Sequence, residues 1–367
     1  MSESSSPAAR FARSILTQYL KVRPGENVTI EGWSHSLPWA TALAREARLL
    51  KAHPLVLHED EETYWDLLDG KQEGTYGAAP SHEWAALSKT NVYLHMWGPG
   101  DKVRLEKMGP RAEKTFAWND AWYKTATRAG VRGARLEIGR PFPTLAKAYG
   151  VDQETWTDQL LEACTVDPKA MRREAGPIAK ALERGRRIRI HDDDGTDLTL
   201  GLSHNPAVIA TGTPTEEERK RPFAILSNLP AGSVTVVPDP QVAEGTIRAN
   251  RSSYSDTVKA TGGVFEFKGG RLVSQHYETG WEEMFAKSYA KGGKDRDRPA
   301  QLRIGLNPKL RDTPQLEDIE AGAITVCIGM NRFLPGGKNK STYFGFVVNA
   351  GAKIEVDGKP VPLPRAG

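Results

Sequence analysis

Helical and extended segments alternate along the first half of this chain, and this alternation limits the possible folds more than any other feature of the sequence. Residues 8–21 carry apolar side chains at helical spacing, and residues 27–31 form a strand-like run. A second helical segment at 37–51 leads into a second strand-like run at 54–58, and the pattern continues beyond it. Such alternation is typical of βαβ units on a parallel sheet. We therefore predict an α/β domain over residues 1–185.

The character of the sequence changes after this point. Short apolar runs such as 264–267 and 323–326 are separated by Gly, Pro and Asn, with one helical segment at 281–289. Runs of this length fit the strands of an antiparallel, partly closed sheet. We predict a second, β-rich (α+β) domain over residues 186–367.

Composition excludes several classes of protein. Lys and Arg outnumber Asp and Glu by only 50 to 46, so the mixed-sign surface gives no support to nucleic-acid binding. No apolar run approaches the roughly 20 residues that span a bilayer, and the N-terminal segment lacks the apolar core of a secretory signal. Two cysteines, Cys164 and Cys327, fit a reducing compartment. We expect a cytoplasmic protein that binds neither nucleic acid nor membranes.

The chain contains a series of short motifs, mainly in its second half. They are Pro24-Gly-Glu-Asn-Val28, Gly195-Thr-Asp-Leu198, Asn228-Leu-Pro-Ala-Gly232, Ile304-Gly-Leu-Asn-Pro308, Gly322 to Gly329, Gly336-Gly-Lys-Asn339 and Val356-Asp-Gly358. Each motif is weak alone, but their order and spacing resemble those of the aminopeptidase T/AmpS-type metallopeptidases. The resemblance covers nearly the whole chain.

This resemblance implies an α/β domain followed by a β-rich domain, in a homodimer whose active sites face an internal cavity. It also implies two metal ions, held by carboxylates and imidazoles of the C-terminal domain, that activate water to remove the N-terminal residue of a peptide. The family also contains iron-dependent ring-opening dioxygenases, which use two histidines and an aspartate in the same region.

The expected metal ligands are replaced at every position to which the motifs assign them. The first Glu falls on Ser233 and the second on Gln301. The His of the following strand falls on Thr325, and the terminal His-x-Asp falls on Phe344 and Phe346. Hydroxyl, amide and phenyl groups cannot replace carboxylates and imidazoles as ligands of such a cation pair. We therefore expect no metal and no other cofactor, for either the peptidase or the dioxygenase branch.

Other side chains near these positions offer alternative chemistry. A lysine beside apolar rings has reason for a lowered pKa, so Lys338 is a candidate base, although a solvated loop lysine is the simpler reading. Tyr343 is a candidate general acid or base. Ser233 is a candidate nucleophile, although no Gly-x-Ser-x-Gly elbow surrounds it and its hydroxyl is equally suited to bond neighbouring backbone.

The remaining candidates are substrate-binding residues for a small molecule or a short peptide. An arginine in a cavity without metal suits an anionic substrate, and an intradomain salt bridge is the alternative. The full set of substrate-binding candidates is Arg248, Gln301, Thr325, Asn331, Asn339, Phe344 and Phe346.

Three functions remain open from the sequence. The first is a metal-independent hydrolase or lyase acting on a small polar or aromatic molecule in the internal cavity. The second is a metal-dependent aminopeptidase, and the third is a non-catalytic dimeric binding or scaffold protein.

Overall fold

The computed structural model describes residues 6–70, 81–114, 117, 119–219, 225–255 and 257–365. The chain forms two compact units, each of which combines segments distant in sequence. The first contains Met1–Thr165 and Gly212–Pro230, and the second contains Val166–Thr211 and Ala231–Gly367. Within the described residues, no helix has the length and apolar character needed to cross a membrane.

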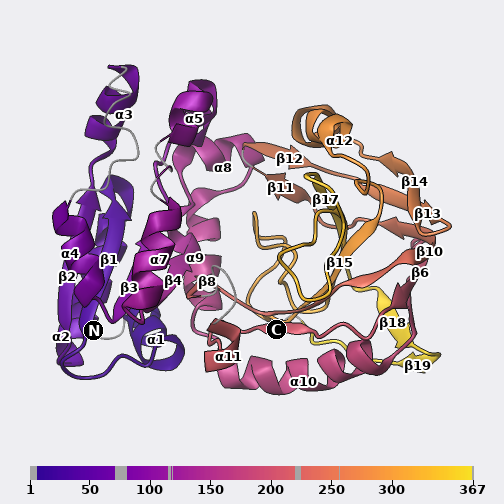
Figure 1. Ribbon diagram of the computed structural model, residues 1–367, viewed down its shortest axis with the longest axis horizontal. Helices are drawn as coiled ribbons and strands as arrows, with labels where there is room; N and C mark the ends of the chain where they lie inside the picture. Colours follow the sequence, from indigo (N-terminus) through magenta and orange to yellow (C-terminus); the bar gives the residue numbers. More distant parts are fainter. Residues whose placement is uncertain are drawn as a thin grey trace. The chain divides into compact units, whose positions relative to one another are not determined.

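The first unit is built on a parallel sheet with strand order β2-β1-β3-β4-β8 (Figure 1). Its strands are β1 (Asn27–Trp33), β2 (His53–Glu59), β3 (Val92–Met96), β4 (Arg132–Leu136) and β8 (Leu226–Leu229). All four strand pairs are parallel, as the alternation of helices and strands predicts. The order reverses at β1, because the chain adds β2 on one side of β1 and β3 on the other.

Helices connect these strands, and several begin at an aspartate. They are α1 (Pro7–Ser14), α2 (Leu37–Leu49), α3 (Glu61–Asp69), α4 (Ser81–Lys89), α5 (Lys102–Met108), α6 (Pro110–Lys114), α7 (Asn119–Arg128), α8 (Pro143–Tyr149), α9 (Gln153–Ala163) and α11 (Glu216–Arg219), with short 3₁₀ or π segments at Ile15–Tyr19, Ser34–Ser36 and Glu137–Gly139. Asp60 accepts a hydrogen bond from the backbone N–H of Thr63, 2.9 Å away, and so caps the free N–H groups at the start of α3.

The second unit contains two antiparallel sheets and a β-ribbon. One sheet has the order β14-β13-β10-β6-β5-β18-β19, and the other has the order β17-β16-β15-β9-β7. The first comprises β5 (Arg187–His191), β6 (Asp197–Leu202), β10 (Pro238–Arg248), β13 (Val264–Lys268), β14 (Arg271–His276), β18 (Lys353–Val356) and β19 (Lys359–Pro360). The second comprises β7 (Val208–Ala210), β9 (Ser233–Val236), β15 (Pro299–Gly305), β16 (Ala323–Gly329) and β17 (Phe344–Ala350). The ribbon pairs β11 (Ser253–Ser255) with β12 (Val258–Ala260).

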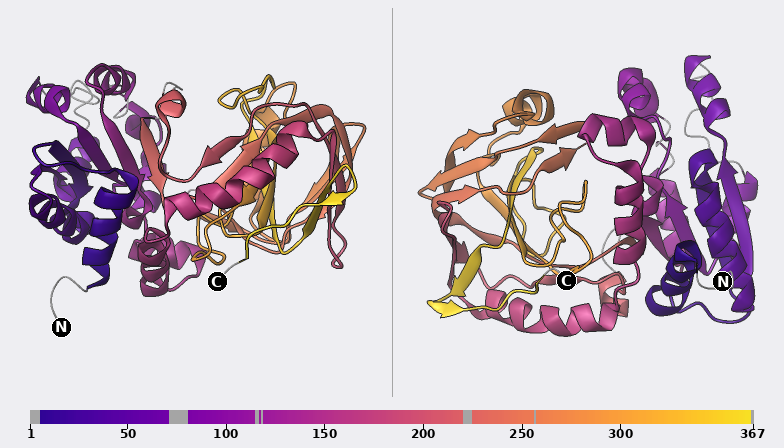
Figure 2. Two further views of the ribbon diagram at one scale, coloured as in Figure 1. Left: turned by 90° about the horizontal axis from the view of Figure 1, so that it is seen from below. Right: turned by 180° about the vertical axis from the view of Figure 1, so that it is seen from behind.

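The helix α10 (Pro168–Arg184) runs along the strands of this second unit (Figure 2). A single boundary near residue 185 would assign it to the first domain. Its buried Ile178 and Leu182 instead join the core made by both antiparallel sheets, which is why it is compact with the second unit. The predicted helix at 281–289 occurs as a π-helical turn, Glu282–Ala286, followed by α12 (Lys287–Lys291). The predicted fold class, α/β followed by a β-rich unit, is confirmed.

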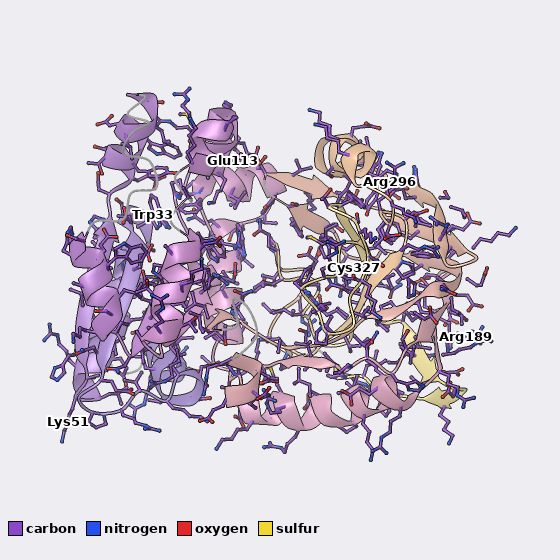
Figure 3. The ribbon with its side chains drawn as sticks, in the orientation of Figure 1. Trp33, Lys51, Glu113, Arg189, Arg296 and Cys327 are labelled. Atoms are coloured by element: carbon purple, nitrogen blue, oxygen red, sulfur yellow. The ribbon has the colours of Figure 1, made fainter. Side chains whose placement is uncertain are left out.

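One face of the β15–β16 sheet supplies much of that core. Leu302, Ile304, Val326 and Ile328 project from it and are fully buried. Because side chains alternate along a strand, the intervening residues project from the opposite face. Cys327 is one of these, and Figure 3 shows it within the strands of this unit. The opposite face carries the candidate site.

Candidate active site on a polar sheet face

The strand register gathers polar side chains on one face of the sheet. Residues directly opposite each other in an antiparallel pair project to the same side. Gln301 lies opposite Cys327, which lies opposite Phe346. Arg303 lies opposite both Thr235 and Thr325. We call this surface the polar face; its residues are Ser233, Thr235, Gln301, Arg303, Thr325, Cys327, Phe344 and Phe346.

All five positions to which the resemblance assigns metal ligands lie on this face. They are nevertheless spread along it, because Ser233 pairs with Gly305, four residues from Gln301 on the same strand. At about 3.3 Å per residue, this places them roughly 13 Å apart along the strand direction. Arg303 lies midway between these two ends.

Arg303 is the central group of the polar face, and the sequence analysis missed it. Its Nε donates to Thr235 Oγ1 at 3.3 Å, and one terminal nitrogen donates to Gln301 Oε1 at 3.4 Å. The other terminal nitrogen forms an ion pair with Asp318. The alternation of side chains along a strand could have indicated it, because Arg303 is two residues after Gln301 and must therefore project from the same face.

Two buried polar atoms beside Arg303 have no hydrogen-bond partner. They are Nε2 of Gln301, which is fully buried, and Oγ1 of Thr325, which is 1% exposed. The amide orientation of Gln301 follows from its neighbour, because a guanidinium has donors only and must face the carbonyl oxygen. The unpaired atom of Gln301 is therefore a true N–H donor. Buried donors of this kind are uncommon and require an explanation.

An acidic loop between β15 and β16 adds a buried carboxyl group, that of Glu317. The backbone N–H of Tyr254 donates to one Glu317 oxygen at 3.2 Å, and the other oxygen has no partner. Burial raises the pKa of Glu317 well above its ordinary value, and the charges of Asp318 and Asp312 add to this. Glu317 also interacts electrostatically with Arg303. The loop thus combines a carboxylate paired to arginine with a carboxyl group whose raised pKa favours the protonated form.

The thiol of Cys327 lies on the polar face but is not activated. Burial raises its pKa to about 12, with the charge of Arg303 opposing this shift and that of Asp318 adding to it. A thiol that keeps its proton at neutral pH is a poor nucleophile.

Tyr343 lies on the other side of the sheet. A Cβ atom added at Gly345 would meet the Tyr343 hydroxyl, so the ring covers Gly345 on the core face. It packs against Tyr289 and Phe285, with ring centroids 5.0 and 6.3 Å away. Burial raises the pKa of Tyr343, and nearby Tyr289 adds to the effect. The structure therefore does not bring Tyr343 together with Ser233.

In the loop between β16 and β17, two buried asparagine side chains form hydrogen bonds that hold the backbone in place. Asn339 Nδ2 donates to the carbonyls of Gly329 and Pro299 at 2.8 and 3.1 Å, and its backbone N–H donates to Asn331 Oδ1 at 3.0 Å. Lys338, in the same loop, is exposed. Among these three candidates, the two asparagines hold backbone and the lysine faces solvent.

Arg248 belongs to the other antiparallel sheet of the unit. It ends β10 and is exposed. Its backbone N–H donates to Thr196 Oγ1 at 3.1 Å, and its carbonyl accepts from Asn349 Nδ2 at 2.9 Å. The structure does not bring Arg248 to the polar face, where Arg303 instead supplies the cationic group.

The polar face does not fit a pair of divalent cations. A guanidinium at its centre would repel them, and the nearby carboxylate of Asp318 is already paired with that guanidinium. In the part of the chain that the structure describes, no three His, Cys, Asp or Glu side chains form a group suited to holding a metal ion.

Residues 5–288 match the sequence model of the thermophilic metalloprotease (M29) family. The chain belongs to the M29 family. This confirms the resemblance to aminopeptidase T/AmpS-type proteins. A search of curated proteins finds no match.

Two solved structures share the fold of this M29 chain. Wild-type AmpT from Thermus thermophilus has 19% sequence identity and a TM-score of 0.68, with 98% of each chain covered. The 2,5-dihydroxypyridine dioxygenase from Pseudomonas putida KT2440 has 16% identity and a TM-score of 0.58, with 98% of this chain and 96% of the other covered. Identities this low establish the common fold and leave the chemistry to the residues of the site.

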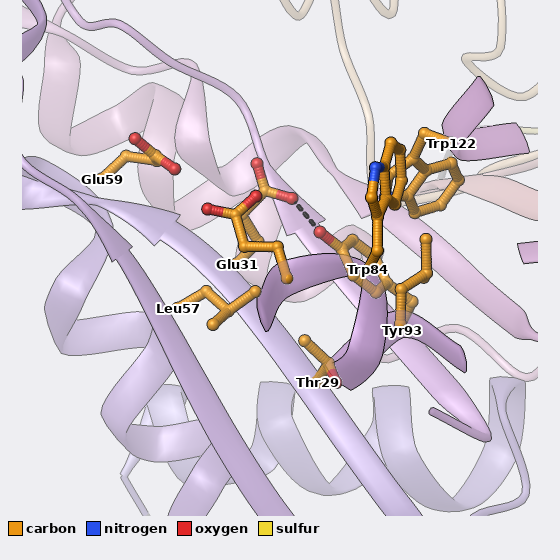
Figure 4. Close-up of a pocket in the computed structure, with 9 residues that line it drawn as sticks. Thr29, Glu31, Leu57, Glu59, Trp84, Tyr93 and Trp122 are labelled. Atoms are coloured by element: carbon orange, nitrogen blue, oxygen red, sulfur yellow. Dashed lines mark hydrogen bonds between the residues drawn. The ribbon is translucent and has the colours of Figure 1, made fainter. Parts of the chain in front are cut away.

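A second group of ionisable residues lines a small cavity of about 50 Å³ in the first unit of the M29 chain (Figure 4). The cavity is lined by Thr29, Glu31, Leu57, Glu59, Glu83, Trp84, Leu87, Tyr93 and Trp122. Tyr93 donates a short hydrogen bond to Glu31, whose other oxygen lies 3.3 Å from His95 Nδ1. These groups lie on β1 and β3, where the strand order reverses.

The three carboxyl groups of this cavity differ in their acidity. Burial alone would raise the pKa of Glu31, but His95 and the hydrogen bonds from His95 and Tyr93 outweigh it and leave the pKa lowered. Burial and the charge of Glu31 raise the pKa of both Glu59 and Glu83. No local sequence pattern indicates this cluster, because its members come from three strands and a helix.

Proposed function

We propose that this M29 chain is a metal-independent hydrolase or lyase that acts on a small polar or aromatic molecule at the polar face. The observation that supports this is the position of Arg303, whose guanidinium occupies the middle of the face to which the family resemblance assigns metal ligands. Hydrolysis and elimination next to a carbonyl both develop negative charge on oxygen. A fixed guanidinium in a mostly buried setting stabilises that charge, as a metal ion does in other enzymes.

The neighbouring groups suit the remaining requirements of such a reaction. Burial raises the pKa of Glu317 and so favours its protonated form, which makes Glu317 the candidate general acid. The rings of Phe344 and Phe346, with centroids 5.9 Å apart, give the edge of the face an apolar wall suited to a flat substrate. Ser233 lies at the far end of the face, and its hydroxyl serves substrate contact better than attack, since no base is paired with it.

Family membership favours a second candidate, a metal-dependent aminopeptidase. The two candidates differ in one measurable property, the dependence of turnover on a bound metal. We suggest measuring metal content by mass spectrometry, and turnover of a panel of small esters, amides and aminoacyl anilides before and after dialysis against a chelator.

The proposal requires well under one metal ion per chain and turnover that survives the chelator. Near-stoichiometric zinc, cobalt or iron, with turnover of aminoacyl anilides lost on its removal, would establish the aminopeptidase instead. A protein that turns over no member of the panel, yet binds small molecules at this face, would be a binding protein.

A further inference from the structure

We propose that the polar face binds the carboxylate group of a small organic acid through Arg303, Gln301 and Thr325. The inference rests on the proposed function for the reaction and deepens it by naming the charged group of the substrate. Its evidence is the set of hydrogen-bond donors that the protein leaves unused.

The donors around Arg303 outnumber the acceptors. A guanidinium has five N–H groups, and three of them are directed to Thr235, Asp318 and Gln301. Two N–H groups therefore remain on Arg303. The amide nitrogen of Gln301 and the hydroxyl of Thr325 add further donors, both at least nine-tenths buried and both without a partner.

This arrangement selects the chemistry of the missing partner. Desolvated donors without an acceptor cost roughly 1–3 kcal/mol each, so the partner that relieves them must bring several lone pairs. A carboxylate accepts hydrogen bonds at two oxygens and matches the fork of an arginine. A cationic ligand would be repelled by Arg303, and a neutral amide would turn its own N–H groups towards other donors.

The charges on the face favour a monoanion over a dianion. Asp318 already neutralises part of the charge of Arg303, and burial of Glu317 raises its pKa and favours its uncharged form. A dianion such as phosphate would approach Asp318 with more charge than the face compensates. A monovalent carboxylate is therefore the better match.

The charged groups of the polar face are partly exposed to solvent. The Arg303 side chain is 25% exposed and that of Asp318 is 22% exposed, whereas Gln301 and Thr325 are buried beside them. The guanidinium is thus open to a ligand from solvent, and the two unpaired donors lie buried next to it. Phe346, opposite Cys327 in the next strand, is half-buried and also packs against the core, so only part of its ring is left to contact the rest of the molecule.

The test compares benzoate with benzamide, which has the same shape but lacks the charge, by isothermal titration calorimetry. Formate, acetate and inorganic phosphate serve as further probes. We expect benzoate to bind at least tenfold more tightly than benzamide, and phosphate to bind more weakly than benzoate. Equal affinity for benzoate and benzamide, or tighter binding of phosphate, would overturn the assignment of a carboxylate.

Variants locate the binding. Thr325→Val removes one unpaired donor without changing side-chain shape, and we expect roughly tenfold weaker benzoate binding, as for loss of a hydrogen bond to a charged group. Thr211→Val is the matched control, because Thr211 Oγ1 is also buried and unpartnered but lies beyond the end of β7. Arg303→Lys keeps the charge, loses the fork, and should weaken binding more than tenfold.

Equal effects of Thr325→Val and Thr211→Val, or normal benzoate binding by Arg303→Lys, would place the ligand elsewhere. If either polar-face variant fails to fold, the comparison of benzoate with benzamide on the unaltered protein still decides the ligand class. Benzoate binding without turnover of any substrate would refute the proposed function alone. Turnover by the unaltered protein that is lost in Arg303→Lys, together with equal benzoate and benzamide affinity, would refute the carboxylate assignment alone.

Discussion

Glu317 provides a sharp test of the electrostatics of the polar face, because its buried carboxyl group retains a proton that an unfolded chain would release. The groups that face it are Asp318 and Asp312 on its own loop, the backbone N–H of Tyr254 on β11, and Arg303 on β15. Burial, followed by the two aspartates, raises the pKa of Glu317. Above the ordinary pKa of a glutamate, the folded protein therefore binds more protons than the unfolded chain.

The sign of the pH dependence follows from this difference. As the pH rises above the ordinary glutamate pKa, the unfolded chain ionises Glu317 while the folded protein does not. The free energy of unfolding then falls with a slope that approaches about 1.4 kcal/mol per pH unit, until the folded pKa is reached. Glu317→Gln keeps the shape of the side chain and the acceptor for Tyr254, and removes the titration.

We expect Glu317→Gln to be more stable than the unaltered protein by about 1–2 kcal/mol near pH 8, after allowing for the unpartnered amide, and nearly equal to it near pH 5. Because the chain has two units, urea unfolding should be followed by pulse-labelling hydrogen exchange on peptides from β15 and β16. This readout reports the unit that contains Glu317.

Glu320→Gln on the same loop is the matched control. Both oxygens of Glu320 accept hydrogen bonds from Arg251, at 2.7 and 2.9 Å, so this change removes the charge partner and one acceptor of a partly buried arginine. We expect a loss of about 2–3 kcal/mol, the opposite sign. Parallel pH curves for the unaltered protein and Glu317→Gln, or lower stability of Glu317→Gln at pH 8, would refute the reasoning.

Three further predictions can be tested with the same protein. Tyr343→Phe removes a buried hydroxyl that has no hydrogen-bond partner, so the free energy of unfolding should stay constant or rise by up to about 1 kcal/mol, with turnover unchanged; a large loss of turnover would return Tyr343 to the site. Tyr93→Phe removes the hydrogen bond to Glu31 and should destabilise the first unit by about 1–3 kcal/mol in urea titrations read by tryptophan fluorescence, whereas no change would mean that the bond contributes nothing. Because the pKa of Glu31 is lowered, its pairing with His95 stabilises the folded state above the ordinary glutamate pKa, and this contribution is lost as the pH falls through the folded pKa; Glu31→Gln should flatten that acid limb, and an unchanged limb would contradict the assignment.

Local sequence patterns carried enough information to predict the type of each unit. The alternation of helical and extended segments from residue 8 onwards predicted a parallel sheet, because a crossover helix is what joins parallel strands. The same patterns could not predict that Leu226–Leu229 completes that sheet, since its partner Arg132–Leu136 lies about ninety residues earlier. Nor could they assign Pro168–Arg184, whose apolar face fits either unit until the core is formed.

For the candidate site, the family resemblance predicted which positions lack metal ligands, and the two-residue period of β-strands could have placed Arg303 on the same face as Gln301. What occupies that face depends on the folded chain. The pairing of Arg303 with Asp318, the raised pKa of Glu317 and the position of Tyr343 in the core depend on contacts between separate strands and loops. Ion pairing and desolvation act through space, and a sequence records neither until the chain has folded.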